Sequence, residues 1–405
     1  MSLVNNITAV KGFTCWGAYT GVKSMKRDLG VIKSNVPAKI SAVFTQNKVV
    51  AEPIKISKKH AEDGLAQVVI INSGNANACT GKQGAEGAQA MVDTASDAYN
   101  IDKNLVIIAS TGIIGKKFPT ENVVNGIIET AGKLSDEPKA GVLLANAILT
   151  TDTFAKEGYL PFKIDGTEVN MAGIAKGSGM IHPDMATMLA FITTDVAISQ
   201  PLLDKAFKAA VKNSFNMITV DGDTSTNDMA MVMANGQAGN KEITDEKSKA
   251  YKLFSEKLNE LCIHLAKLIV SDGEGASKMI EYKVINAPDD DTARTIIRTI
   301  SDSSLVKTAM FGRDPNWGRI IAAAGRANVP FDHEIINLKL GSGNIMMDLI
   351  VEGQPVEIEQ AMAKKVLREP QLKVILDMQM GDIEATGWGS DLTTDYVLFN
   401  ATYST

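Results

Sequence analysis

The sequence predicts an α/β fold of the layered αββα type, in which stacked sheets lie between outer helices, with a second and smaller α/β domain. Short runs rich in β-branched residues end in turn residues, which is typical of buried strands. Amphipathic helical patterns lie between these runs. Strands and helices do not alternate with the regular spacing of a βαβ series, so the sequence favours stacked sheets over a Rossmann or TIM-barrel arrangement.

The expected elements follow from these two periodicities. A helix is predicted after Pro201, because Leu203, Phe207, Ala210 and Val211 share one face. A longer helix is predicted to open at Thr244 and to bury Phe254, Leu258, Leu261 and Leu265, and another lies near 357–367. The predicted strands are 67–73, 105–111, 188–198, 217–222, 283–287, 335–341 and 347–353.

A domain boundary is expected after the glycine-rich stretch 271–278 (SDGEGASK), because the segment that follows has strands and a helix of its own. At 405 residues the chain is also long enough for more than one core. The predicted division is a main domain over 1–280 and a C-terminal α/β domain over 281–405.

The composition of the chain indicates what kind of molecule the protein binds. The chain has 41 basic and 47 acidic residues, a formal net charge of -6, and no long block of like charge. This balance argues against a nucleic-acid or anionic-membrane surface and favours small-molecule partners. No run approaches the roughly 20 apolar residues of a membrane span, and the start lacks a signal-peptide pattern, so a cytoplasmic protein is expected.

The cysteines and histidines are too dispersed to form a local site. Three cysteines and four histidines lie far apart in the chain, without metal-ligand spacing. Neither a metal site nor a local histidine triad is therefore expected, and the thiols are expected to be reduced.

The segment 176–195 (KGSGMIHPDMATMLAFITTD) places a hydroxyl residue between a turn-forming loop and an apolar strand. If the peptide bond before Thr187 is strained, the Thr187 hydroxyl can attack the carbonyl of Ala186, and water can then open the resulting ester. The α-amine freed on Thr187, with a pKa of about 8, can then act as a base. In the alternative, Thr187 only starts a strand, as threonine commonly does.

The stretch KGSGMIHPDMATML resembles the cleavage-site signature of the ornithine acetyltransferase family, also called glutamate N-acetyltransferase or ArgJ. The resemblance covers nearly the whole chain. One departure is Asp184, where the family's loop is expected to hold Asn; this extra carboxylate can alter the rate of cleavage. The other segments that resemble the family are 71–81 (INSGNANACTG), 109–116, 149–153, 220–228, 271–278, 312–320 and 395–405.

The resemblance implies a fold like that of N-terminal-nucleophile hydrolases and self-cleavage at Ala186–Thr187 into chains 1–186 and 187–405. It also implies an α2β2 assembly of the cleaved chains. The implied reaction is a ping-pong transfer of an acetyl group from N2-acetylornithine to glutamate through Thr187, with ornithine as the first product. No cofactor is implied, and use of acetyl-CoA as a second acetyl donor stays open.

Thr111 and Gly112 are expected to form the oxyanion hole for this transfer. They follow the strand at 105–110, where glycine lets the backbone approach a reacting atom and the threonine hydroxyl supplies a donor. Without the family resemblance, the same residues would read as an ordinary turn at a strand end.

Substrate-binding roles are likewise implied by the matched segments. Lys176 is expected to pair with a substrate carboxylate and Glu274 with an ammonium group, whereas a lone charged residue is more often a solvated surface group. The remaining predicted contacts are Thr150, with Thr151 less favoured, together with Asn400, Thr187 and Thr405, the last residue, which is expected near Thr187.

Two rival functions stay open. One is an aminopeptidase or amidase of the same fold, in which water replaces glutamate as acceptor. The other is a small-ligand or nucleotide-binding protein, which is disfavoured because no loop matches the phosphate-binding GxxxxGK[ST] pattern. The loop 221–228 (DGDTSTND) lacks the spacing of an EF-hand loop and is expected to be a structural loop near the site.

Overall fold

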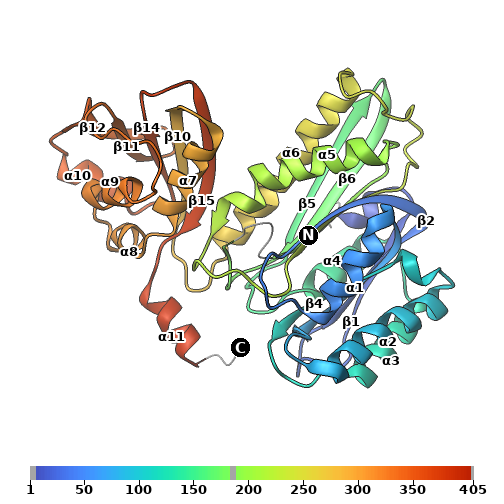
Figure 1. Cartoon of the computed structure of the whole chain (residues 1–405). Coiled ribbons are helices and arrows are strands. Elements are labelled where there is room, and N and C mark those ends of the chain that lie inside the picture. Colours follow the sequence, from blue (N-terminus) through green and yellow to red (C-terminus); the bar gives the residue numbers. More distant parts are fainter. Residues whose placement is uncertain (1–5, 183–187, 403–405) are drawn as a thin grey trace.

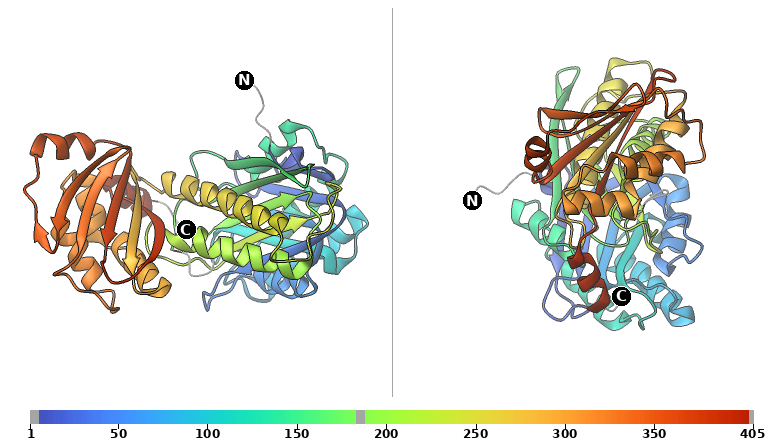
Figure 2. Two further views of the ribbon diagram at one scale, coloured as in Figure 1. Left: turned by 90° about the horizontal axis from the view of Figure 1, so that it is seen from above. Right: turned by 90° about the vertical axis from the view of Figure 1, so that its left-hand side faces the viewer.

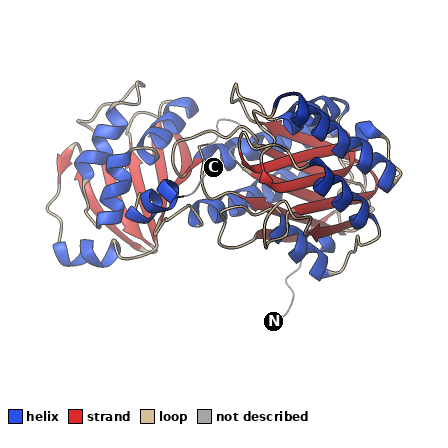
Figure 3. Cartoon of the chain, turned by 90° about the horizontal axis from the view of Figure 1, so that it is seen from below, coloured by secondary structure: helices blue, strands red, loops and turns tan. Residues whose placement is uncertain are grey.

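The chain forms two lobes, each with its own sheet, in a computed structural model that describes residues 6–182 and 188–402. Residues 1–5, 183–187 and 403–405 lie outside the described ranges. The lobes lie side by side when the molecule is seen from above (Figure 2), and helices pack against the strands of both (Figure 3).

The larger lobe is built on an eight-stranded sheet. Its strands are β1 (Phe13–Ala18), β2 (Leu29–Phe44), β3 (Leu65–Asn75), β4 (Val106–Ile113), β5 (Lys156–Ile164), β6 (Thr167–Lys176), β7 (Leu189–Thr194) and β9 (Met229–Ala234). The order is β4-β3-β2-β9-β7-β6-β5, with β1 paired to β2. The long strand β2 serves both halves, because its residues 29–33 pair with β3 and its residues 39–44 pair with β9.

Helices cover both halves of this sheet. They are α1 (Glu52–His60), α2 (Gly81–Tyr99), α3 (Thr120–Ala131), α4 (Pro138–Ala147), α5 (Gln200–Asn213) and α6 (Lys249–Ser271). One core lies between α2, α3 and the strands β3 and β4, and another lies between α5, α6 and the strands β6, β7 and β9. The opposite-facing side chains of both halves share a third core. The layering of strands between outer helices confirms the predicted α/β class.

The smaller lobe holds a seven-stranded sheet in the order β13-β12-β11-β14-β10-β15-β8. Its strands are β8 (Ile218–Thr219), β10 (Met279–Ala287), β11 (Asn337–Ser342), β12 (Ile345–Val351), β13 (Gln354–Pro355), β14 (Gln371–Asp377) and β15 (Ile383–Ser390). Its helices are α7 (Asp290–Ser301), α8 (Ser304–Gly312), α9 (Trp317–Gly325) and α10 (Gln360–Val366). Helix α11 (Thr394–Thr402) follows the last strand and lies below this lobe in Figure 1. Strand β8 comes from far before residue 280, and the predicted boundary there stays a prediction.

Most predicted elements are confirmed, and three differ in their bounds. The helix expected from Thr244 begins at Lys249, because the Ser248 hydroxyl caps it by accepting a hydrogen bond from the Tyr251 amide. The strand expected over 217–222 is only β8, because Asp221 turns away to accept hydrogen bonds from backbone amides of the neighbouring loop. The run 188–198 yields the shorter strand β7.

Cys15, Cys79 and Cys262 are free thiols, as the sequence predicts. In the described parts of the chain, no helix is both long and apolar enough to cross a bilayer.

Candidate active site

A cavity of about 200 Å³ opens where strands β4 and β6 end, and it collects residues from the whole length of the chain. Two wider hollows, of about 620 and 660 Å³, contain none of the predicted site residues. The cavity at the strand ends is therefore the candidate active site. Six predicted residues line it: Thr111, Gly112, Thr150, Lys176, Glu274 and Asn400.

The remaining predicted residues are only partly accounted for. Thr151, the less favoured substrate contact, lines the cavity beside Thr150, so both threonines reach it. Ala186, Thr187, Thr405 and also Asp184 lie outside the described residues. Their roles stay predictions.

Strand β4 brings Thr111 and Gly112 to the cavity at the end of a parallel strand pair. In the register of β3 and β4, Ser73 lies opposite Thr111 and Gly74 lies opposite Gly112. Gly112 has a φ of +130°, and a Cβ at this position would lie 2.4 Å from the carbonyl carbon of Gly74. Only glycine can therefore bring its backbone this close to the neighbouring strand.

Lys176, the last residue of β6, puts an almost buried ammonium group at the same place. Its Nζ donates to Thr111 Oγ1 at 3.4 Å, and only 7% of the residue is exposed. Burial lowers the pKa of Lys176, although the neighbouring carboxylate of Asp152 opposes this shift. Lys176 is a basic side chain of the cavity lining, and its ammonium form can meet a substrate carboxylate.

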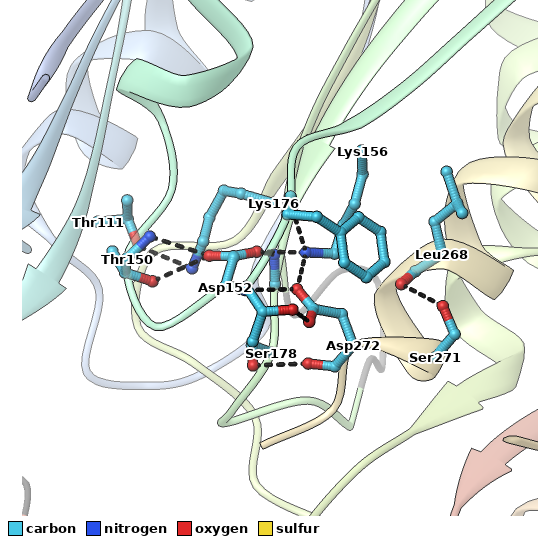
Figure 4. A network of polar contacts seen from close by, with 12 residues as sticks. Thr111, Thr150, Asp152, Lys156, Lys176, Ser178, Leu268, Ser271 and Asp272 are labelled. Atoms are coloured by element: carbon cyan, nitrogen blue, oxygen red, sulfur yellow. Dashed lines mark hydrogen bonds and ion pairs between the residues drawn. The ribbon is translucent and has the colours of Figure 1, made fainter. Parts of the chain in front are cut away.

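A buried cluster of charges stands behind Lys176 (Figure 4). Lys156 Nζ lies 2.7 Å from Asp152 Oδ1 and 2.6 Å from Asp272 Oδ2. Burial by itself would raise the pKa of Asp152, but the charges of Lys176 and Lys156 outweigh it and hold that pKa well below its usual range. Asp152 is therefore an anion that fixes its neighbours.

Glu274 supplies a carboxylate to the same cavity. Asn400 Nδ2, from helix α11, donates to Glu274 Oε2 at 3.0 Å, which brings the C-terminal helix to the cavity. The Glu274 amide donates to the carbonyl of Ser178 at 2.9 Å, which ties this wall to the loop after β6. The cavity lining therefore includes both an ammonium group and a carboxylate.

The loop 221–228 contributes residues that the sequence did not assign to the site. Asp221 accepts hydrogen bonds from the amides of Met180 and Ile181 at 2.7 and 2.8 Å. Asp221 and Met180 line the cavity, whereas Ile181 does not. Asp228 also lines the cavity, but its Oδ2 is buried and has no hydrogen-bond partner among the described residues. Burial raises the pKa of Asp228 well above its usual range, against the opposing charge of Lys176.

The same loop also holds the described residues that flank 183–187. The Val220 amide donates to the Ile181 carbonyl at 2.7 Å, and Thr224 Oγ1 donates to the His182 carbonyl at 2.9 Å. On the far side, the Met229 amide donates to the Met188 carbonyl at 2.9 Å. The residues on both sides of 183–187 are therefore hydrogen-bonded to the segment 219–229. The many polar residues of this segment are the sequence signal that could have assigned it to the site.

The arrangement suits a small zwitterion. An amino acid carries a carboxylate and an ammonium group, which the opposite charges of Lys176 and Glu274 complement. The hydroxyls of Thr111 and Thr150 add short hydrogen-bonding groups. Across the described residues, no group of three or more potential metal-ligating side chains comes together.

Comparisons with known proteins found a matching family and similar proteins. The ArgJ family model matches residues 14–405. The arginine biosynthesis bifunctional protein ArgJ of Caldanaerobacter subterraneus subsp. tengcongensis is 46% identical over 403 residues, covering 100% of this chain and 99% of that protein. The protein of the same name from Thermotoga neapolitana is 46% identical over 399 residues, covering 98% of this chain and 99% of that one.

A solved structure is also similar. It is the ornithine acetyltransferase of Mycobacterium tuberculosis complexed with ornithine, which has 28% sequence identity and a TM-score of 0.41 and covers 46% of this chain and 98% of that chain.

Proposed function

The chain belongs to the ArgJ family and is an enzyme of arginine biosynthesis, and from this premise we propose that it transfers the acetyl group of N2-acetylornithine to glutamate through Thr187. The observation that carries the proposal is the meeting of Thr111, Gly112, Thr150, Lys176, Glu274 and Asn400 in one cavity. These residues come from distant parts of the chain, and the family resemblance alone implied that they act together.

Maturation comes first in this proposal. The Thr187 hydroxyl attacks the carbonyl carbon of Ala186, the peptide C–N bond breaks, and an ester joins the two residues. Water then hydrolyses the ester, which leaves a carboxylate on Ala186 and a free α-amine on Thr187. The scissile bond lies outside the described residues. Cleavage there is supported by the sequence and by the hydrogen bonds that hold the flanking residues His182 and Met188.

Acetyl transfer then uses the new chain start twice. The Thr187 α-amine accepts the hydroxyl proton as Thr187 Oγ1 attacks the acetyl carbonyl of N2-acetylornithine. The C–N bond breaks, the proton passes to the leaving nitrogen, and ornithine departs from an acetyl-threonine ester. Glutamate attacks that ester through its neutral amine, the Thr187 α-amine accepts a proton from the attacking nitrogen, and the Thr187 oxygen leaves with that proton.

Both half-reactions pass through a tetrahedral intermediate with a developing oxyanion. Thr111 and Gly112 are proposed to donate to this oxygen, and their fixed position at the end of β4 supports that role. Removing one such donor in other enzymes lowers kcat by about 100- to 1000-fold. Lys176 is proposed to hold the substrate carboxylate, and Glu274 the ammonium of ornithine.

The dependence of ornithine release on glutamate distinguishes acetyl transfer from hydrolysis by an aminopeptidase or amidase. The experiment incubates the protein with N2-acetylornithine, with and without glutamate, and follows ornithine, acetate and N-acetylglutamate. Sustained ornithine release that needs glutamate, with N-acetylglutamate formed in equal amount, supports transfer. Release of acetate at one rate with or without glutamate would instead indicate an amidase or aminopeptidase. Thr187→Ala should abolish both cleavage and transfer.

Three further expectations belong to the same proposal. The two processed chains are proposed to stay associated and to pair as an α2β2 assembly in the cytoplasm. Transfer is proposed to need no cofactor. Acetyl-CoA is proposed as an additional acetyl donor.

A further inference from the structure

Lys156 carries a charge at a place that is completely buried. The residue begins strand β5 with 0% of its side chain exposed, and its Nζ contacts carboxylate oxygens of both Asp152 and Asp272. A buried ion stays favourable only while its partners compensate for lost hydration. Without Lys156, two carboxylates would face each other in the interior. This cluster touches the candidate active site through two separate routes.

The first route runs through Asp152 to one wall of the cavity. Asp152 Oδ2 accepts from the Thr150 amide at 2.9 Å, and Asp152 Oδ1 accepts from the Gly177 amide at 2.7 Å. Thr150 lines the cavity, as does Lys176, the residue bonded to Gly177. The backbone on both sides of this wall is therefore held by one carboxylate.

The second route runs through Asp272 to the wall of the cavity that carries Glu274. The carbonyl oxygen of Asp272 accepts from Ser178 Oγ at 2.7 Å, and the Ser178 carbonyl accepts from the Glu274 amide at 2.9 Å. Asp272 Oδ2 also accepts from the Thr153 amide at 3.0 Å, which leads back to the loop beside Asp152 (Figure 4). The two walls thus meet at the Lys156 ammonium.

The cluster also spans the proposed cleavage site. Asp152 and Lys156 belong to the segment 1–186, whereas Asp272 belongs to 187–405. After cleavage, the contact between Lys156 and Asp272 would be a buried ion pair between two chains that are no longer covalently joined. No peptide bond near the site would then hold the two walls together.

We propose that Lys156 is a positioning residue for acetyl transfer, whose ammonium holds the wall carrying Lys176 in place relative to the wall carrying Glu274. The inference rests on the proposed function and adds a residue that does not line the cavity. An apolar side chain could fill the same volume, but it could not fix two carboxylates. The charge of Lys156, and not its bulk, is therefore the property to test.

Lys156→Met tests this by keeping most of the volume and removing the charge. Transfer is measured as kcat and KM for both substrates, per mole of cleaved enzyme as counted by intact mass. We expect kcat/KM to fall by at least about tenfold, with raised KM values, because displacement of binding groups by about 1 Å can lower rates about 100-fold. Lys39→Met is the matched control, since Lys39 pairs with Glu242 across the same cleavage site but on the exposed surface. It should stay within about twofold of the wild type.

A second substitution separates charge from packing. In Lys156→Met/Asp272→Asn one of the two facing carboxylates is removed, so the double variant should recover at least about threefold of the transfer lost in Lys156→Met. Losses that simply multiply, or a Lys156→Met enzyme with wild-type constants, would overturn the proposal. If Lys156→Met does not fold, Asp272→Asn alone should raise both KM values, and unchanged values would overturn it equally. Wild-type enzyme that releases no ornithine would instead refute the proposed function.

Discussion

Asp152 and Asp228 are two carboxylates beside one cavity that differ in their surroundings. Both are almost inaccessible, at 5% and 3% exposed. Asp152 contacts the Lys156 ammonium and two backbone amides, and its pKa is lowered. Asp228 keeps one oxygen without a partner among the described residues, and its pKa is raised. Equal burial therefore produces opposite protonation behaviour, and the neighbours decide which carboxylate belongs to the framework and which is available to a ligand.

The largest effect is expected at the paired carboxylate. Asp152→Asn leaves the two buried ammonium groups of Lys156 and Lys176 with less compensating charge, which should reduce the free energy of unfolding by about 3–5 kcal/mol. Asp152 has a lowered folded pKa, so its contribution is present above its unfolded pKa of about 3.9 and is lost only as pH falls through the folded pKa. Thermal midpoints of wild type and variant should therefore differ equally at about pH 5 and about pH 8. Similar midpoints for the two proteins would break the comparison.

A smaller effect of opposite sign is expected at the unpaired carboxylate. The folded pKa of Asp228 is raised, so its penalty is absent below the unfolded pKa of about 3.9 and grows as pH rises towards the folded value. Relative to wild type, Asp228→Asn should gain at least about 1 kcal/mol of stability between about pH 4.5 and about pH 8. Thermal midpoints across that range measure the gain, with Asp223→Asn, another residue of the cavity lining, as control. A difference that does not change with pH would show that Asp228 is not an uncompensated acid.

The availability of Asp228 makes a separate prediction for binding. We expect its carboxylate to meet an ammonium group of a bound amino acid, because such a contact would supply a partner for Oδ2, which has none among the described residues. Asp228→Asn should therefore weaken ornithine binding by about tenfold or more, measured by calorimetry, while it stabilises the empty protein. Unchanged ornithine affinity would restrict Asp228 to a structural role.

The smallest effect is expected at the exposed pair of Lys39 and Glu242, whose side chains are 37% and 47% exposed. Solvent screens such a pair, so Glu242→Gln should change the free energy of unfolding by less than about 1 kcal/mol. Chemical denaturation of Glu242→Gln beside Asp152→Asn places the two kinds of ion pair on one scale. Comparable losses in the free energy of unfolding would mean that burial does not make one ion pair more important for stability than the other.

The sequence predicts the site best where a residue terminates a regular element. Thr111 and Gly112 follow an apolar strand pattern, so local periodicity already places them at a strand end. Lys176 ends strand β6, which the sequence did not predict, and only the family resemblance assigned it to the site. Family resemblance supplied the reason to group them with Glu274 and Asn400.

The buried charges are the part that the sequence could not supply. Lys156 and Asp272 are separated by 116 positions, and neither has a local pattern that distinguishes it from a solvated surface residue. Asp228 differs from Asp223 of the same loop in being buried, and its Oδ2 has no partner among the described residues, neither of which a local pattern records. The predicted ends of one helix and one strand were wrong for a related reason. Hydrogen bonds made by the side chains of Ser248 and Asp221 determine where these elements begin and end.

The most direct test of the central claim is the intact mass of freshly purified, transfer-active protein under denaturing conditions, followed by N-terminal sequencing of the fragments. Cleavage before Thr187 predicts two chains whose masses sum to 43.3 kDa plus one water, with a second chain that begins Thr-Met-Leu-Ala. Thr187→Ala should remain one chain of nearly 43.3 kDa without transfer activity. A single uncut chain in the active wild-type preparation, or a new N-terminus at another residue, would contradict the account.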